Sequence, residues 1–427
     1  MKTDKGLDFI YKIEYVVFIL LALLQVNFFN LPFIPDSLLS INSNIAKQLT
    51  LYLVVFAFIV WLPSLFSSPR SRNMISLSLS SVLLIVTVIC LTILSSRAYG
   101  SPIFQTFRNG YYYWIPVYFF VANFLFRRYS VEMVKLIKAI GYIDLIVILA
   151  QDILFKYAGL IILKLDAFSS NSLLTTGRLL LDGDFLLAIS FVILFQASLE
   201  HRRLHIGELL YLFFFAVHQA LFAQGRVGFL IFLGMLAGYF VYLIVKLPFL
   251  PRIIVFGVYL VAAIIAFVEL LRSMNFLGGT RAASGRVRLY EIDYFLGMSK
   301  LHGFWGIGFS NDSSLMNGGL ALQNVWGGKY AISDVGLIGY LGIFGFLGIP
   351  FIISYLVQLL VLCLKKMHLG QIIIVLAYFI GQWGTLFPLN VSRIFLFSIL
   401  SALIVYSANS FPVVPAEVEM KSHEAYS

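Results

Sequence analysis

The chain has 427 residues, of which 60% are hydrophobic and only 12% are charged, and its formal net charge is +10. A soluble domain carries roughly 25% charged residues, so this composition argues against a soluble protein and predicts a polytopic membrane protein. The positive charge is then expected to reflect membrane topology and anionic lipid rather than nucleic acid. Two cysteines, Cys90 and Cys363, lie far apart in apolar segments and predict no disulfide framework.

Twelve apolar blocks are each about long enough to cross a bilayer, and they predict an all-α membrane protein. The first block lacks a small-residue cleavage site, so we expect a retained helix rather than a signal peptide. The tenth block is long for one span, which predicts a helix that is tilted or partly outside the bilayer. The predicted spans are Tyr15–Phe33, Leu49–Phe66, Ile75–Leu94, Tyr111–Phe126, Leu136–Phe155, Gly183–Leu199, Gly207–Phe222, Gly228–Val245, Ile253–Leu271, Val335–Leu364, Gln371–Phe387 and Ile394–Ser407.

These spans divide the chain into four parts. Residues 1–271 form a membrane domain with nine helices, residues 272–334 a long extracytoplasmic loop, and residues 335–408 a membrane domain with the last three helices. The polar tail, residues 409–427, is expected to be disordered. Basic pairs in the short loops fall on one side of the predicted helices, which the positive-inside rule makes cytoplasmic. Both termini are therefore expected inside and the long loop outside.

The long loop is the longest stretch that could not sit in a bilayer. It holds eleven glycines, and its first part, Arg272–Tyr290, has four arginines and no acidic residue. Further arginines stand in short outer turns, where each could pair with a carboxylate or extend to lipid headgroups. Together they favour an outward chamber for an anion, because a planar guanidinium suits phosphate better than a lysine ammonium does. These arginines are Arg97, Arg108, Arg178, Arg226 and Arg393.

Glycines recur at every third position from Gly336 to Gly348. Such a row lets a neighbouring helix or a lipid tail approach closely, and plain helix packing is the simpler interpretation. Ionisable residues also occur inside the predicted spans, where they are rare and need a partner. Asp152 and Glu269 lie at outer depth, and we expect them to pair with the outer arginines rather than to act in catalysis.

Five short patterns follow one another in a fixed relation to the predicted helices. They are Thr176-Gly177-Arg178 with Gly183-Asp184, Gln224-Gly225-Arg226-Val227-Gly228, Ser284-Gly285-Arg286-Val287-Arg288-Leu289-Tyr290 at the start of an expected helix, Trp305-Gly306-Ile307-Gly308-Phe309, and Asp334-Val335-Gly336-Leu337-Ile338-Gly339. Their order resembles that of the bacterial O-antigen polymerase and O-antigen ligase superfamily, although Asp184 stands where that family usually has asparagine. The resemblance covers roughly Arg178 to Gly348.

The resemblance implies a GT-C-like inverting glycosyltransferase of the bacterial inner membrane that needs no metal, cofactor or nucleotide sugar. Donor and acceptor would both be oligosaccharides on undecaprenyl pyrophosphate, with membrane lipid and a chain-length regulator as further partners. The outer residues show no His/Asp cluster with metal-ligand spacing, in agreement with this expectation.

Transfer from a pyrophosphate needs the charge of the leaving group to be stabilised, and fixed arginines can do this without a metal. The predicted catalytic residues are therefore Arg226, Arg286 and Arg288, with His302 or Asp334 as candidate bases for the acceptor hydroxyl. Two simpler interpretations stay open: Arg286 and Arg288 could pair with nearby acids, and Asp334 could cap the tenth helix. The predicted substrate-binding residues are Arg97, Arg178, Arg281, Tyr290 and Arg393.

Two other functions remain as alternatives. In the ligase branch a histidine lies just before the Gly-Leu-x-Gly stretch, whereas Tyr330–Asp334 contains none, so the sequence favours a polymerase. A flippase for lipid-linked oligosaccharides would also have about twelve helices and a basic chamber. A flippase would not need a long glycine-rich loop late in the chain, and it would more often show two similar halves.

Overall fold

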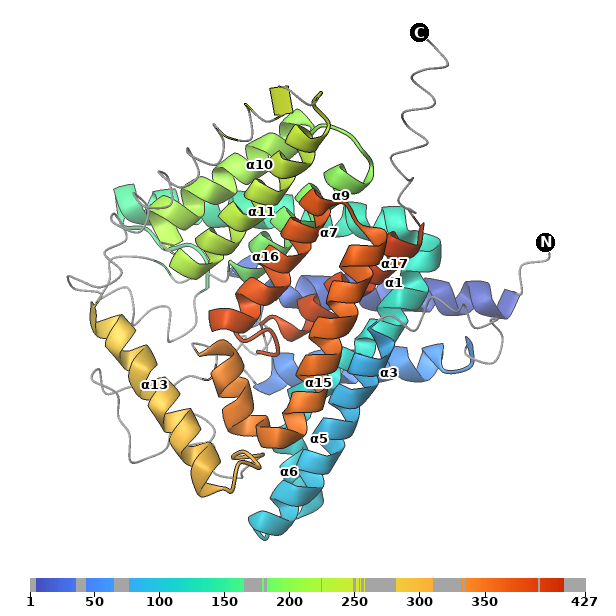
Figure 1. The fold of residues 1–427 in the computed structure, drawn as a ribbon, viewed down its shortest axis with the longest axis vertical. Coiled ribbons are helices and arrows are strands. Elements are labelled where there is room, and N and C mark those ends of the chain that lie inside the picture. Colours follow the sequence, from blue (N-terminus) through green and yellow to red (C-terminus); the bar gives the residue numbers. More distant parts are fainter. Residues whose placement is uncertain are drawn as a thin grey trace.

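The computed structural model describes residues 5–35, 44–64, 77–164, 179, 183–223, 225–248, 251–252, 254, 257, 282–309, 332, 335–390 and 392–410. Every regular element in this part of the chain is helical (Figure 1). Four of these helices are long and apolar enough to cross a membrane: Ser78–Ala98, Ile206–Ala223, Arg226–Val245 and Gly336–Lys366. The prediction of an all-helical chain is confirmed for this part, and the remaining spans stay predictions.

The helices follow the predicted apolar blocks, with several changes at their ends. In chain order they are α1 (Lys5–Gln25), η1 (Asn27–Asn30), α3 (Asn44–Trp61), α5 (Ser78–Ala98), α6 (Ile103–Asn109), η3 (Tyr111–Val117), α7 (Tyr118–Ala158), α9 (Asp184–Leu199), α10 (Ile206–Val217), the π-helical η4 (His218–Ala223), α11 (Arg226–Val245), α13 (Ala282–Leu301), α15 (Gly336–Lys366), α16 (Leu369–Thr385) and α17 (Ile394–Ser410).

The centre of the molecule is formed by α9 and α17, which are buried along almost their whole length. A helix that is apolar on all sides must be surrounded by other apolar surfaces. Accordingly, α9 contacts α7, α10, α11, α16 and α17. The ends of these central helices therefore fix where the connecting turns lie.

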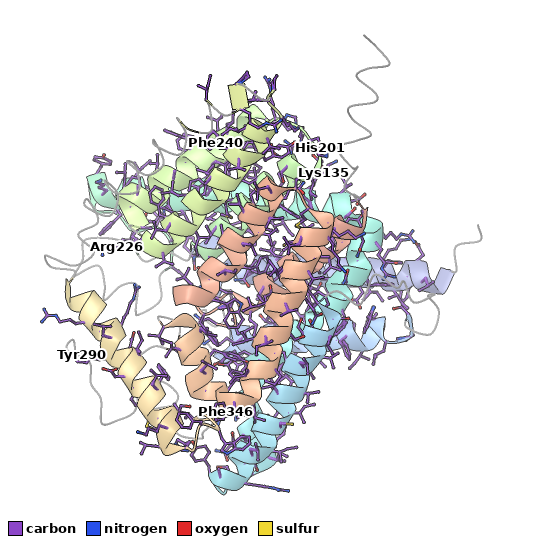
Figure 2. All side chains as sticks on the ribbon, viewed as in Figure 1. Lys135, His201, Arg226, Phe240, Tyr290 and Phe346 are labelled. Carbon is purple, nitrogen blue, oxygen red and sulfur yellow. The ribbon has the colours of Figure 1, made fainter. Side chains whose placement is uncertain are left out.

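Three chain segments meet at one end of the molecule. Arg128 forms an ion pair with Asp8 in the first turns of α1, and the hydroxyl of Tyr406 near the end of α17 lies 3.1 Å from that of Ser130. Figure 2 shows Lys135 and His201 towards this end and Tyr290 and Phe346 away from it. The first turn of α1 and the last turn of α17 thus lie away from α13 (Figure 1).

Two basic side chains contact the carboxylate of Glu208 in the first turn of α10. The two carboxylate oxygens accept hydrogen bonds from Arg202 at 2.6 and 2.8 Å, from Lys138 at 2.5 Å and from the backbone N–H of His205 at 3.0 Å. This cluster fixes the turn between α9 and α10 against α7. Of the basic loop residues in the prediction, Arg202 belongs to this cluster, and the cytoplasmic location of these residues stays a prediction.

The predicted fourth and fifth spans form one element with a break. Helix α7 runs from Tyr118 to Ala158 and leaves helical geometry only at Tyr129, where φ is −116° and ψ is 28°. The start of the predicted fourth span is the 3-10 helix η3, which contains Pro116. Proline lacks the N–H that a regular helix interior needs. Because α7 continues from the fourth predicted span into the fifth and leaves helical geometry only at Tyr129, the predicted loop between them is a bend in one helix.

The predicted tenth span is also divided, because Gly345 in α15 has φ of 54° and ψ of −148°. In a straight helix, positions eleven residues apart are separated by about 16.5 Å. The ring centroids of Tyr340 and Phe351 are only 6.0 Å apart, so the first arm, 336–344, folds back on the second, 346–366 (Figure 1). The extra length of the predicted tenth span is thus a hairpin of two arms rather than one straight helix, and its position relative to the bilayer stays a prediction.

Candidate functional site

The Gly-x-Gly segment of the long loop is bound to the bend of α15. We call residues Phe304–Phe309 the strap. The N–H groups of Ile307 and Gly308 donate to the carbonyl oxygens of Gly342 and Ile343 at 2.8 and 3.0 Å, and Phe346 N–H donates to Phe304 at 2.9 Å. A helix end leaves carbonyl groups without intrahelical partners. The break at Gly345 frees such carbonyls, and the strap satisfies them.

Glycine is required on both sides of this contact. Gly306 has φ of +83°, and a Cβ atom there would lie 2.7 Å from the backbone nitrogen of Gly345. A Cβ atom at Gly345 would overlap the strap backbone at Phe304 and Trp305.

In the first arm, a Cβ atom at Gly342 would lie 2.8 Å from the Phe295 side chain of α13. A Cβ atom at Gly336 would overlap the carbonyl oxygen of Trp383 in α16. The prediction that the glycine row permits close packing is confirmed, and its partners include the strap, α13 and α16.

A cavity of about 280 Å³ lies between the strap and the end of α5. The Tyr99 hydroxyl donates to the carbonyl oxygen of Ile307 at 2.6 Å, and Phe309 N–H donates to Ser95 Oγ at 2.9 Å, so α5 holds the strap from the other side. The rings of Tyr99 and His302 are 6.3 Å apart at the cavity. Burial raises the pKa of Tyr99 above its usual value, which keeps its hydroxyl a donor. His302 thus lines a mostly apolar cavity together with the polar side chains of Ser95 and Tyr99.

Helix α13 carries three predicted site residues. Val287, Glu291 and Phe295 are buried at intervals of four, which places one stripe of the helix against α15. The expected helix at Ser284–Tyr290 is therefore confirmed. Arg286 and Tyr290 are exposed one turn apart on another face, and Figure 2 shows Tyr290 at the edge of the molecule.

Arg288 lies between the two faces of α13 and is partly buried. Its Nε atom is buried and has no hydrogen-bond partner in the part of the chain that the structure describes. A buried guanidinium donor without a partner is costly, and an anionic group beside α13 would relieve that cost. Among the predicted catalytic arginines on α13, Arg288 therefore has the surroundings that best fit an anion.

Arg226 is the first residue of α11. Gly225, which precedes it, and Gly183, which precedes α9, leave room for the side chain of Gln219. A Cβ atom at Gly225 would lie 2.5 Å from Oε1 of Gln219, and one at Gly183 would lie 2.7 Å from Nε2. Gln219 belongs to the π-helix η4 and is 6% exposed. The side chain of Gln219 therefore lies between the starts of α9 and α11. Gln219 was not singled out from the sequence, because the apolar pattern of its own helix does not show which residues of other helices it contacts.

Asp152 pairs with a histidine of η4. Its Oδ2 atom lies 2.7 Å from Nδ1 of His218, and the two side chains are 4% and 1% exposed. His218 opens the π-helix η4, an irregularity that is frequent at functional sites. His218 on η4 is thus a partner of this carboxylate that the sequence did not predict, and pairing of Asp152 with an outer arginine stays a prediction.

We expect this buried pair to contribute to stability as a unit. Replacing His218 or Asp152 singly by leucine should lower the free energy of unfolding by roughly 1–3 kcal/mol, because the remaining polar group loses its partner. The double replacement should recover much of that loss, as apolar pairs often substitute well for buried polar pairs. Thermal unfolding of the purified chain in detergent measures this. A double variant that is worse than the sum of the two single variants would contradict the pairing.

The other predicted residues are placed as follows. Nε of Arg393 lies 2.8 Å from Oδ2 of Asp184, which also accepts a hydrogen bond from Ser392 Oγ at 3.0 Å. Arg393 is thus held in an ion pair, and a role in substrate binding stays a prediction. Arg97 is exposed in the last turn of α5. Arg178, Arg281, Asp334 and Glu269 lie outside the described residues.

Comparison with models of known protein families and with curated proteins finds no match for this chain.

Proposed function

We propose that this chain is a polymerase of O-antigen or a related surface polysaccharide. It would join repeat units carried on undecaprenyl pyrophosphate at the outer face of the bacterial inner membrane. The long loop would lie outside and both termini inside. The proposal rests on the order of the five sequence patterns and on one structural observation, the anchoring of α13 and its arginines by the strap.

The anchoring supports the proposal through the requirements of sugar transfer. An arginine stabilises a leaving pyrophosphate only if it is held in place before the charge develops. The strap is bonded to α15 and to α5, and α13 precedes the strap directly while packing Phe295 on Gly342 of α15. Arg286 and Arg288 are therefore carried by a helix that is fixed at its C-terminal end and along one face.

The reaction can be written with these residues in named roles. The acceptor hydroxyl oxygen bonds to the anomeric carbon of the donor sugar, and the bond from that carbon to the pyrophosphate oxygen breaks with inversion. The electron pair leaves on the pyrophosphate, where Arg226, Arg286 and Arg288 would stabilise it. The hydroxyl proton passes to a base, for which His302 and Asp334 are the candidates. Tyr290 and the outer arginines would contact the glycan or its phosphates.

A gene deletion tests the function as a whole. Removing this chain from its bacterial host should replace the ladder of surface polysaccharide by a single repeat unit on the lipid A-core, and a plasmid copy should restore the ladder. Electrophoresis of surface polysaccharide measures the outcome. Loss of the single unit as well would favour a flippase or a ligase, because both of those activities are needed to display any repeat unit.

A further inference from the structure

A small recess lined by both polar and apolar side chains lies where α1 ends and α3 begins. It has a volume of about 40 Å³, whereas one water needs roughly 10–15 Å³ by the same kind of measure, so it could hold a group of a few heavy atoms. Its polar side chains come from three places: Gln25 and Asn27 at the end of α1, Lys47 and Thr50 in the first turns of α3, and Ser392 before α17.

Three of these side chains already have partners within the protein. Gln25 donates to the carbonyl oxygen of Ser392 at 2.6 Å, Thr50 donates to that of Ala46 at 3.0 Å, and Ser392 donates to Asp184. For the side chains of Lys47 and Asn27, no hydrogen bond or ion pair is found within the described ranges. The recess thus offers one ammonium group and one amide group.

The placement of Lys47 is unfavourable without an anion. It stands in the first turn of α3, where the helix dipole disfavours a positive charge and favours a negative one. Asp184, which accepts a hydrogen bond from Ser392 of the recess, is paired with Arg393 at 2.8 Å. Lys47 and the dipole of α3 therefore attract the same kind of ligand to the same recess.

Asn27 is held in the recess by an uncommon backbone. Asn27, Phe28, Phe29 and Asn30 have φ values of 48°, 48°, 61° and 52°, which makes η1 a short left-handed turn that L-residues rarely adopt. Asn27 is only 6% exposed, yet its side chain lines the recess. Buried amides without protein partners usually bind water or a ligand.

We propose that this recess binds the phosphate group of an anionic amphiphile, through the Lys47 ammonium and the Asn27 amide. Phosphate fits the charge of the lysine, the donor of the amide and the size of the recess. The phosphate can belong to a lipid headgroup or to a pyrophosphate-linked carrier, and both share this chemistry. None of Arg226, Arg286 and Arg288 lines the recess, and the proposal does not depend on the proposed polymerase activity.

The test follows the acetylation of Lys47 by mass spectrometry in the full-length chain, purified in maltoside micelles. Inorganic pyrophosphate or added phosphatidylglycerol should slow acetylation of Lys47 but not that of Lys300, an exposed lysine near the end of α13. Protection by both probes indicates a general phosphate site. Protection only by the lipid identifies a headgroup site, and protection only by pyrophosphate identifies a carrier site. Equal protection by sodium chloride at matched ionic strength, or none, overturns the proposal.

Two variants give an independent measurement by thermal unfolding. In a chain with Arg286→Ala and Arg288→Ala, the more effective of the two phosphate probes should still raise the unfolding temperature. Adding Lys47→Gln or Asn27→Asp should weaken the apparent affinity for that probe about ten- to a hundred-fold. Lys47→Gln removes the charge-assisted hydrogen bond, and Asn27→Asp places a negative charge against the phosphate. Asparagine and aspartate both tolerate a positive φ, so Asn27→Asp should fold. Unchanged affinity in both variants would show that the recess is not the site.

Discussion

Replacing Arg288 by alanine should strongly reduce long surface polysaccharide while leaving a single repeat unit on the cell surface. Its Nε atom is buried without a hydrogen-bond partner among the described residues, so an anion is the partner that we expect. One charge-assisted hydrogen bond contributes roughly 1.5–3 kcal/mol, which corresponds to about a ten- to a hundred-fold loss of rate. Arg286→Ala and Arg226→Ala should act in the same direction.

The lysine variants separate charge from geometry. If the guanidinium binds pyrophosphate through two parallel N–H donors, Arg→Lys keeps the charge but loses the second donor. Each lysine variant should then lose much of the rate, although less than the alanine variant. Electrophoresis of surface polysaccharide, with protein amounts checked by blotting, measures this. Lys300→Ala, an exposed residue near the end of the same helix, should leave the ladder unchanged.

Two outcomes would count against this assignment. A normal ladder in all three alanine variants would mean that these arginines are only solvated charges. Loss of the single-unit band together with the ladder would place the defect before polymerisation and favour a flippase.

The second large effect is expected at the bend of α15. Gly345→Ala should lower the free energy of unfolding by about 2–6 kcal/mol, from about 1–3 kcal/mol of backbone strain and about 1–3 kcal/mol of overpacking. The strain arises because φ of 54° with ψ of −148° is essentially restricted to glycine. The overpacking arises because the new Cβ would meet the strap backbone, which cannot rotate away as a side chain could.

Gly297 provides the matched control for this substitution. It is an exposed glycine inside α13, and a Cβ atom there would meet nothing within 4 Å. Gly297→Ala should therefore stabilise the chain by roughly 0.5–1 kcal/mol. Both variants can be compared by thermal unfolding in the same detergent. A Gly345→Ala chain as stable as the Gly297→Ala chain would show that the strap is not held at this bend.

The helices could be predicted from the sequence because apolar length and composition are local properties. The same holds for α13, which the pattern Ser284–Tyr290 already placed in the long loop. The bend at Gly345 could not be predicted in this way, because the hydropathy of α15 continues unchanged through it. A glycine row is compatible with a straight helix, with close packing and with a break. Only the strap, about forty residues earlier in the chain, decides between them.

The site was predictable in its residue types but not in its contacts. Arginines in an outer loop indicate an anion, but no sequence pattern could show that Tyr99 of α5 binds Ile307 or that His218 satisfies Asp152. These partners are separated by 208 and 66 residues, and each contact depends on how whole helices pack. Gln219 was missed for the same reason, since the glycines that accommodate it belong to two other helices.

The most direct test is to reconstitute the purified chain in liposomes with repeat units on undecaprenyl pyrophosphate, without nucleotide sugar and with a metal chelator. We expect lipid-linked glycans of two or more units, and one undecaprenyl pyrophosphate released for each bond formed. The Arg288→Ala chain should release far less. Movement of single units across the bilayer without any longer glycan would contradict the polymerase proposal and identify a flippase.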